Sequence, residues 1–263
     1  MRTRYWVGGE GPPLVLVHGL AGAAYNFTEL APLLARRRRV LVPDLPGHGG
    51  TAPLPAVRTM GELAAHVAAV AEHEGMTPAE VLGYSLGGVV ALRLAAEKPD
   101  LVSAVVLLAS AGIVSTTPRA RVWLAATSTL RPARVVAHAR REIARRPRLR
   151  SAVFGFWGAE DPRALSPEAV LGFLAAQPEH TDVRRTARAL ARDDPRAYVD
   201  RVRCPALVTW GARDRLVPLE DGFELARGLE APLRVLPGAG HLLVAERPRE
   251  CAALVLEFLD GVR

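Results

Sequence analysis

The sequence is poor in cysteine and has no long apolar run. The only two cysteines, Cys204 and Cys251, lie far apart and lack the spacing of a metal site, which argues against a disulfide framework and against a cysteine-ligated metal. Two reduced thiols indicate a cytoplasmic protein. No apolar run approaches the roughly 20 residues that a membrane-spanning helix needs. Residues 1–13 also lack the apolar core of a secretory signal, so we expect no signal peptide.

Lysine is almost absent, and the basic charge is concentrated in one segment. The net charge is +7, yet Lys98 is the only lysine. Residues 112–200 hold 16 arginines against nine acidic residues, whereas the rest of the chain holds 18 basic and 18 acidic residues. The densest stretch, residues 119–150, is interpreted as a solvated helical face; alternatively it attracts an anionic substrate, the phosphates of a thioester carrier or an anionic membrane. Nothing in the sequence supports nucleic-acid binding.

Short apolar runs alternate with helical patterns along most of the chain. Such runs are typical of strands that are buried on both faces of a parallel sheet, so the alternation predicts an α/β protein with a mostly parallel, doubly wound sheet. The segment 3–17 is expected to form an antiparallel hairpin at the sheet edge. The expected strands are residues 14–17, 40–42, 80–83, 101–109, 206–210 and 233–236, and the expected helices are residues 60–73, 86–97, 219–229 and 242–259.

This alternation stops between residues 112 and 200. The stretch has prolines at seven positions, with helical pieces between them and no strong β-like run. We therefore predict that residues 1–111 and 201–263 form the α/β core and that residues 112–200, hereafter the insertion, form a helical cap.

The segment Gly83-Tyr84-Ser85-Leu86-Gly87 fits the pattern G-x-S-x-G, and it follows an expected strand and opens an expected helix. In that setting the serine lies on a sharp turn at the carboxyl edge of the sheet, and the glycines allow strand and helix to cross closely. The N–H of Leu86 then points to where a tetrahedral oxyanion would form. The pattern predicts a nucleophilic Ser85.

A serine nucleophile needs a base and an acid that orients the base. His241 lies in a glycine-rich loop after the last expected strand, and Asp214 lies in the loop after residues 206–210; both loops are at the carboxyl edge, where sites in open α/β sheets gather. Asp221 is a weaker alternative because it falls inside an expected helix. Among the other histidines, His138 and His180 are expected to be solvated.

The chain order Ser85, Asp214, His241 is the order found in α/β-hydrolases, and the sequence resembles that superfamily along nearly its whole length. The matching segments are His18 to Gly22, Asp44 to Gly49, Gly83 to Gly88, Gly211 to Pro218, and Gly240-His241 through Glu246-Arg247-Pro248.

The resemblance implies an α/β-hydrolase fold with a helical cap inserted after the sixth strand. It implies that the N–H of Leu20 is the second oxyanion donor and that the turn from Asp44 to Gly49 is structural, so that His48 is not a second base. Residues expected to lie near the substrate are His18, Gly19, Tyr84, Trp123, Phe154 and Trp157, although each aromatic residue of the insertion can equally pack its helices onto the core.

The sequence therefore predicts a serine hydrolase that cleaves a carboxylic ester or thioester of a small to medium apolar molecule without a metal or cofactor. Ser85 argues against epoxide hydrolases and haloalkane dehalogenases, which use aspartate at this position. Alternatives on the same three residues are a carbon–carbon bond hydrolase and a cofactor-free haloperoxidase or perhydrolase. A non-catalytic ligand-binding protein is a further alternative, because the fold does not fix the function.

Overall fold

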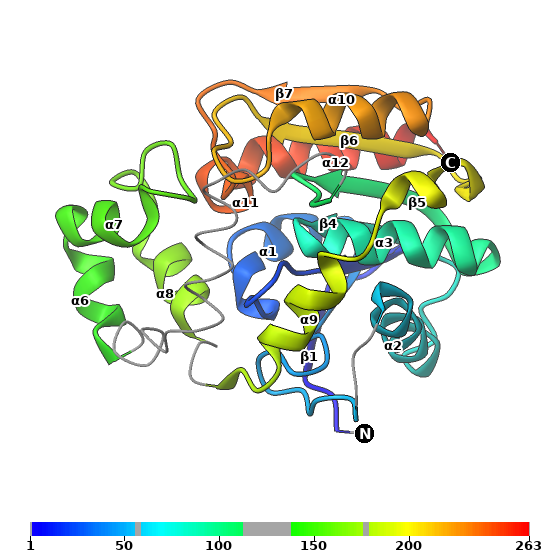
Figure 1. Ribbon diagram of the computed structural model, residues 1–263, viewed down its shortest axis with the longest axis horizontal. Coiled ribbons are helices and arrows are strands. Elements are labelled where there is room, and N and C mark those ends of the chain that lie inside the picture. Colours follow the sequence, from blue (N-terminus) through cyan, green and yellow to red (C-terminus); the bar gives the residue numbers. More distant parts are fainter. Residues whose placement is uncertain (1, 56–58, 113–137, 176–178, 263) are drawn as a thin grey trace.

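The computed structural model describes residues 2–55, 59–112, 138–175 and 179–262. Within these residues the chain forms one seven-stranded sheet in the order β1-β3-β2-β4-β5-β6-β7, parallel except for β1 (Figure 1). This architecture confirms the α/β prediction. The strands are β1 (Tyr5–Gly8), β2 (Pro13–Val17), β3 (Arg39–Pro43), β4 (Ala79–Tyr84), β5 (Val102–Leu108), β6 (Ala206–Gly211) and β7 (Leu233–Leu236).

The expected hairpin of residues 3–17 is wrong, because β1 pairs antiparallel with β3 and not with β2. Burial explains the difference. Residues 14–17 of β2 are completely buried and suit a central strand, whereas Tyr5, Trp6 and Val7 of β1 are more than a third exposed and suit an edge. At the other edge, β7 also exposes side chains, so only the inner strands are buried on both faces.

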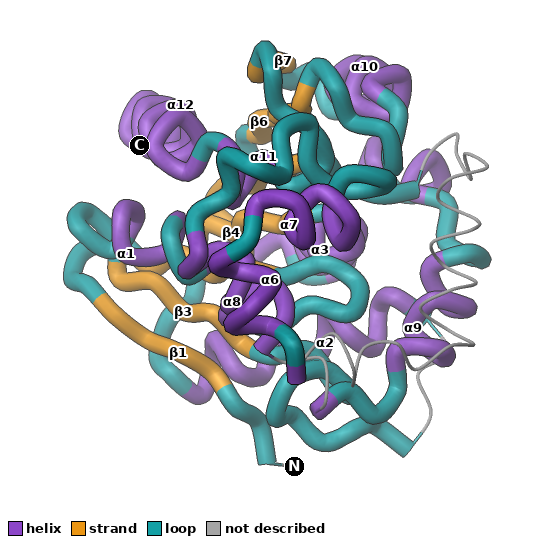
Figure 2. The backbone as a smooth tube through the Cα atoms, turned by 90° about the vertical axis from the view of Figure 1, so that its left-hand side faces the viewer, coloured by secondary structure: helices purple, strands orange, loops and turns teal. Residues whose placement is uncertain are grey.

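Helices cover both faces of the sheet (Figure 2). On one face lie α2 (Met60–His73), α3 (Leu86–Glu97) and α10 (Leu219–Gly228); on the other lie α1 (Leu30–Leu34) and α12 (Pro248–Gly261). The doubly wound arrangement leaves the loops at the carboxyl ends of the strands free to carry functional groups.

The single helix expected over residues 242–259 is divided in two. The short helix α11 (Leu243–Glu246) ends before Pro248, where α12 begins. Proline disfavours helical backbone at the residue before it, and Arg247 accordingly adopts a φ of −136° and a ψ of 50°. The break leaves Glu246 as the last residue of α11, outside the long helix, which matters for the site described below.

The insertion contains α6 (Arg140–Arg145), α7 (Pro147–Phe154), α8 (Pro167–Ala175) and α9 (Val183–Leu190) among its described residues. Figure 1 shows α6, α7 and α8 beyond one end of the strands, while α9 returns toward α2 and α3. Counted along this chain the insertion follows the fifth strand, β5, and not a sixth, because one strand fewer precedes it than the resemblance implied. Across the described residues, no helix has both the length and the apolarity to cross a membrane.

The tightest crossing in the core lies where β4 leads into α3. A Cβ on Gly83 would lie 2.3 Å from the carbonyl oxygen of Gly87, and a Cβ on Gly87 would lie 2.0 Å from the carbonyl oxygen of Val17 in β2. Any side chain at either position would push α3 away from the sheet. These two glycines therefore set the position of the turn at Ser85.

Replacing Gly87 by alanine should destabilise the fold by at least about 1–3 kcal/mol, because the added methyl group meets backbone that has no room to move. Urea unfolding measures the effect. Gly261→Ala is the matched control in another helix, since nothing lies within 4 Å of a Cβ there; it should change the unfolding free energy by less than about 0.5 kcal/mol. Equal stability of the two variants would contradict the prediction.

Candidate active site

Ser85 lies on the turn between β4 and α3 in a strained backbone conformation, with a φ of 54° and a ψ of −120°. Non-glycine residues rarely adopt a positive φ, so surrounding contacts must hold it. The N–H of Ser85 donates to the carbonyl of Leu108 at 3.0 Å, and its own carbonyl accepts from Gly88 at 2.9 Å and from Ala111 at 3.0 Å. These bonds fix a half-buried hydroxyl at the carboxyl edge of the sheet.

The structure brings Ser85, His241 and Asp214 together. His241 Nε2 lies 3.0 Å from Ser85 Oγ, and His241 Nδ1 lies 2.8 Å from Asp214 Oδ2. The side chain of Asp214 is fully buried and that of His241 is 3% exposed. A carboxylate oxygen only accepts, so Nδ1 carries the proton and Nε2 of the neutral imidazole is free to accept from the serine hydroxyl.

Asp214 is itself held in place by the backbone of its loop. Its second oxygen, Oδ1, accepts the N–H groups of Leu216 at 2.8 Å and Val217 at 2.9 Å. This leaves Oδ2 facing His241. The alternative carboxylate, Asp221, is buried inside α10, as the sequence predicted, and the carboxylate that faces His241 Nδ1 is that of Asp214.

The loop after β2 lies beside Ser85. A Cβ on Gly19 would lie 3.2 Å from Cβ of Ser85. The imidazole of His18 is completely buried: Nε2 accepts the N–H of Leu45 at 2.9 Å, so Nδ1 carries a proton and donates to the carbonyl of Gly19 at 2.8 Å. Because a trans peptide points its C=O and N–H in opposite directions, this bond directs the N–H of Leu20 away from His18. Burial lowers the pKa of His18, which agrees with its neutral form.

Tyr84, the last residue of β4, packs its ring beside His241 at a centroid distance of 5.4 Å. It is only 3% exposed, and it also contacts Phe27 edge to face at 6.4 Å. Burial raises the pKa of its phenol, and the nearby carboxylates of Asp214 and Glu246 add to that rise. Tyr84 is therefore an uncharged side chain that packs against the ring of His241.

The turn from Asp44 to Gly49 is built around the buried carboxylate of Asp44. Its Oδ1 accepts the N–H of Ala24 at 2.7 Å, and its Oδ2 accepts Arg4 Nε at 2.8 Å and the N–H of Gly50 at 2.9 Å. His48 is completely buried in this turn, and its Nδ1 lies 3.1 Å from the carbonyl oxygen of Pro46. This geometry agrees with a structural role for the turn.

His180 was expected to be solvated, and that expectation is wrong. It belongs to a cluster of three imidazoles: the ring centroid of His180 lies 5.5 Å from that of His48, which lies 5.4 Å from that of His18, and the rings are inclined to one another by 60° and 49°. Its Nδ1 accepts the N–H of Gly49 at 3.1 Å, so Nε2 carries the proton and donates to the carbonyl of Ala21 at 2.8 Å. His180 thus fastens the insertion to the loop after β2, which lies beside Ser85, and to the turn from Asp44 to Gly49. These long-range contacts have no local sequence signal.

The aromatic residues of the insertion pack mainly against one another. Phe154 is 1% exposed and lies 6.0 Å from Trp157 and 6.4 Å from Phe173, so it fills the interior of the insertion. Trp157 is half-buried and donates Nε1–H to the carbonyl of Val153 at 3.0 Å. Trp123 lies outside the described residues.

The described arginines of the dense stretch lie mostly at the surface. Arg141, Arg145 and Arg148 are exposed, whereas Arg150 is buried and donates to the carbonyl of Leu165 within the insertion. The exposed guanidinium groups are consistent with a solvated face.

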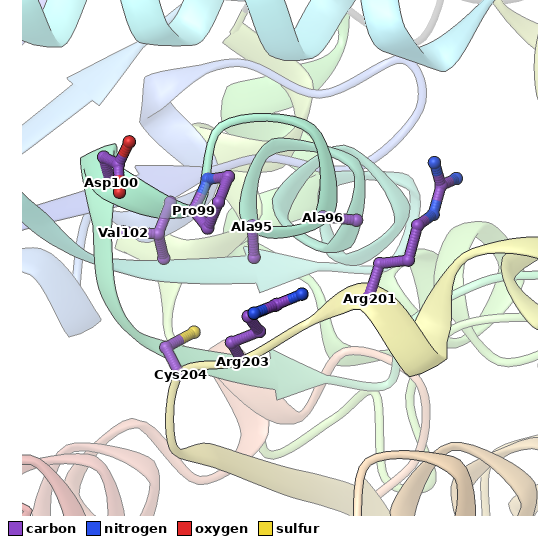
Figure 3. A pocket seen from close by; sticks show the side chains of 8 residues that line it. All are labelled: Ala95, Ala96, Pro99, Asp100, Val102, Arg201, Arg203 and Cys204. Atoms are coloured by element: carbon purple, nitrogen blue, oxygen red, sulfur yellow. The ribbon is translucent and has the colours of Figure 1, made fainter.

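A separate pocket of about 570 Å³ lies at the opposite end of the strands (Figure 3). Val102 at the start of β5 and Cys204 just before β6 line it together with Asp100, Arg201 and Arg203. It therefore takes no part in the Ser85 site. In the part of the chain that the structure describes, no three His, Cys, Asp or Glu side chains gather as metal ligands.

A buried Ser–His–Asp chain at the carboxyl edge of a doubly wound sheet is the arrangement expected of α/β-hydrolases. A family model described as the alpha/beta hydrolase fold matches residues 12–248. The chain belongs to the α/β hydrolase fold family.

Relatives and solved structures agree with this membership. The chain is 30% identical to a pimeloyl-(acyl-carrier protein) methyl ester esterase from Chromobacterium violaceum, over 96% of each chain. It is 32% identical to the dihydrolipoyllysine-residue acetyltransferase component of an acetoin cleaving system from Pseudomonas putida, over 96% of this chain but only 65% of that one. A thermophilic esterase from Thermogutta terrifontis superposes with a TM-score of 0.75 at 25% identity, covering 99% of this chain and 93% of that chain.

The cluster of His18, His48 and His180 predicts that acid weakens the fold. Burial lowers the pKa of His180 to about 4, against about 6.5 in the unfolded chain. Between these values the unfolded state binds more protons, so the unfolding free energy falls as the pH drops from 6.5 toward 4, by about 2 kcal/mol between pH 7.5 and pH 5 for His180 alone.

Urea unfolding at pH 7.5 and pH 5 measures this loss. His180→Ala should be less stable at pH 7.5 but should lose less stability on going to pH 5. His73→Ala, which removes an exposed histidine from α2, should keep the wild-type pH dependence. The same pH dependence in all three proteins would contradict the assignment.

Proposed function

We propose that the protein is a serine hydrolase that cleaves a carboxylic ester or thioester of a small to medium apolar substrate through an acyl-enzyme on Ser85. The observation that carries the proposal is the unbroken hydrogen-bonded chain from Ser85 Oγ through His241 to Asp214, with contacts of 3.0 Å and 2.8 Å. The family membership and the ester hydrolase among the 30% identical relatives support it.

In the first step His241 Nε2 takes the proton of Ser85 as Oγ attacks the carbonyl carbon. The imidazolium that forms is stabilised by Asp214, which is already held by two backbone N–H groups. His241 then gives its proton to the leaving alcohol or thiol. In the second step His241 activates water, which releases the acid and restores Ser85.

The negative oxygen of each tetrahedral intermediate is assigned to the N–H groups of Leu20 and Leu86. Leu86 is the first residue of α3, so its N–H has no acceptor inside the helix and the helix dipole favours an anion there. The bond from His18 to the carbonyl of Gly19 supports the orientation proposed for Leu20. Losing one such donor typically costs about 100- to 1,000-fold in rate.

The substrate is proposed to enter between the core and the insertion, with Gly19 and Tyr84 beside the reacting carbonyl and Trp157 nearby. The exposed arginines of the insertion are proposed to attract an anionic group on the substrate or its carrier from solution, because they face solvent. A cytoplasmic location remains a prediction from the two free thiols, Cys204 and Cys251.

A series of p-nitrophenyl esters from acetate to palmitate tests the proposal. Ser85→Ala should lower turnover by several orders of magnitude, on the order of a million-fold, because no other group can form the acyl-enzyme. The chain length with the highest kcat/KM then gives the size of the acyl pocket. If the wild type turns over none of these esters and a fluorophosphonate does not label Ser85, ester hydrolysis is wrong and ring-cleavage diketones are the next substrates to assay.

Asp214→Asn should lower kcat by about 10,000-fold near neutral pH while leaving the fold intact. The amide oxygen will stay on the N–H groups of Leu216 and Val217, so the amide NH2 faces His241 Nδ1. Nδ1 must then accept, which places the ring proton on Nε2, where it cannot take the proton of Ser85. Steady-state kinetics measure the loss, and unchanged thermal unfolding is the control; a variant within ten-fold of the wild type would contradict this role.

A further inference from the structure

Glu246 is a largely buried carboxylate that no step of the proposed hydrolysis uses. Its Oε1 accepts the N–H of Gly240 at 2.9 Å, and its Oε2 accepts the N–H of Glu160 at 2.7 Å. Gly240 is the residue immediately before His241, whereas Glu160 belongs to the insertion. One side chain therefore connects the loop that carries His241 to the insertion.

The insertion also touches this loop on the other side of His241. The N–H of Leu242 donates to the carbonyl of Gly158 at 3.1 Å. A Cβ on Gly240 would lie 2.7 Å from that same carbonyl oxygen and 2.8 Å from the nitrogen of Glu160. Residues 158–160 thus lie directly against both neighbours of His241, and only glycine at position 240 permits the approach.

The loop that carries Asp214 joins the same assembly. The N–H of Arg213 donates to the carbonyl of Ala239 at 2.9 Å, and Arg215 pairs with the side chain of Glu160 at 2.9 Å. The Arg215 pair is partly solvated and contributes little by itself. The bonds of Glu246 are stronger, because each joins a backbone N–H to a carboxylate that is largely buried.

We propose that Glu246 is a positioning residue for His241: its carboxylate fixes the His241 loop to residues 158–160. His241 therefore keeps its hydrogen-bonding position beside Ser85 only while residues 158–160 remain packed against this loop. The effect of Glu246 on catalysis rests on the proposed function, whereas its contacts with Gly240 and Glu160 are independent of that function. The insertion thereby becomes part of the machinery that sets the geometry of His241.

The double acceptor explains why a carboxylate is needed at this position. Burial raises the pKa of Glu246, and the N–H groups of Glu160 and Gly240 oppose that rise because they stabilise the charged form. Glutamine has one accepting oxygen, so its NH2 group would face one of the two N–H donors. Aspartate keeps the charge but is one methylene group shorter, so it cannot reach both.

Glu246→Gln, compared with Glu250→Gln, tests the inference. Glu250 is an exposed acid four residues further on, paired with Arg247 at 3.5 Å, so its replacement removes the same charge but keeps both bonds of Glu246, to Gly240 and to Glu160. Titration with a fluorophosphonate counts the active sites, so that kcat is given per site. Glu246→Gln should lower this kcat about 10- to 100-fold, which is the effect of losing one hydrogen bond to a charged group, and should leave KM within about three-fold of the wild type. Glu250→Gln should keep both constants within about two-fold.

A second measurement does not depend on turnover. The proton between His241 Nδ1 and Asp214 Oδ2 should give a low-field 1H NMR signal that broadens in Glu246→Gln and stays sharp in Glu250→Gln, and the amides of Gly240 and Glu160 should exchange faster in the first variant. If Glu246→Gln matches Glu250→Gln in kcat, signal and exchange, the inference is overturned.

The two proposals fail in different ways. A wild type without ester turnover, combined with a broadened signal in Glu246→Gln, would remove the proposed function and leave the positioning role standing. Should glutamine prevent folding, Glu246→Asp should show the same selective loss of kcat and the same broadening. An Asp variant with wild-type kcat and signal would overturn the inference.

Discussion

The rest of the site depends on the close approach of three backbones where β4 turns into α3. Gly83 and Gly87 let the helix start almost in contact with β2, and this leaves Ser85 no choice but a positive φ. Such strain costs on the order of 1–3 kcal/mol, and the three backbone hydrogen bonds of Ser85 offset it. The same approach brings the loop after β2 beside Ser85. A single packing constraint thus places the serine hydroxyl, the start of a helix and the neighbouring loop within a few ångströms.

Around that rigid centre, each remaining functional group sits on a loop that the backbone itself restrains. Asp214 is held by two N–H groups of its own loop, and His18 holds the carbonyl of Gly19. The insertion contacts this centre at two places: His180 donates to Ala21 in the loop beside Ser85, and the N–H of Glu160 donates to Glu246 next to the His241 loop. Preorganisation of this kind is what a proton-transfer site needs, because small displacements of the base are costly.

The sequence was sufficient to predict the fold and that Ser85, Asp214 and His241 lie together, because both follow from local sequence patterns. Apolar runs identify the strands, and Ser85, Asp214 and His241 follow β4, β6 and the edge strand β7 in the order that the family uses. Contacts between residues far apart in the sequence could not be predicted from it. The pairing of β1 with β3 depends on which strand is better buried, and the hydrogen bonds of His180 span 131 and 159 residues. The break before α12 did have a signal, because Pro248 stands inside the expected helix.

The contacts between the insertion and the His241 loop also bear on how such a protein can diversify. The bonds to Glu246 and Leu242 come from the main chain of residues 158–160. Every amino acid has the carbonyl group, and every amino acid except proline has the N–H group, that such bonds need. The attachment still limits two of these side chains, because a Cβ on Gly158 would lie 2.9 Å from Leu242 and Ala159 is only 3% exposed. Evolution can therefore change the rest of the insertion, and with it what the insertion recognises, while these few small residues preserve the connection to the His241 loop.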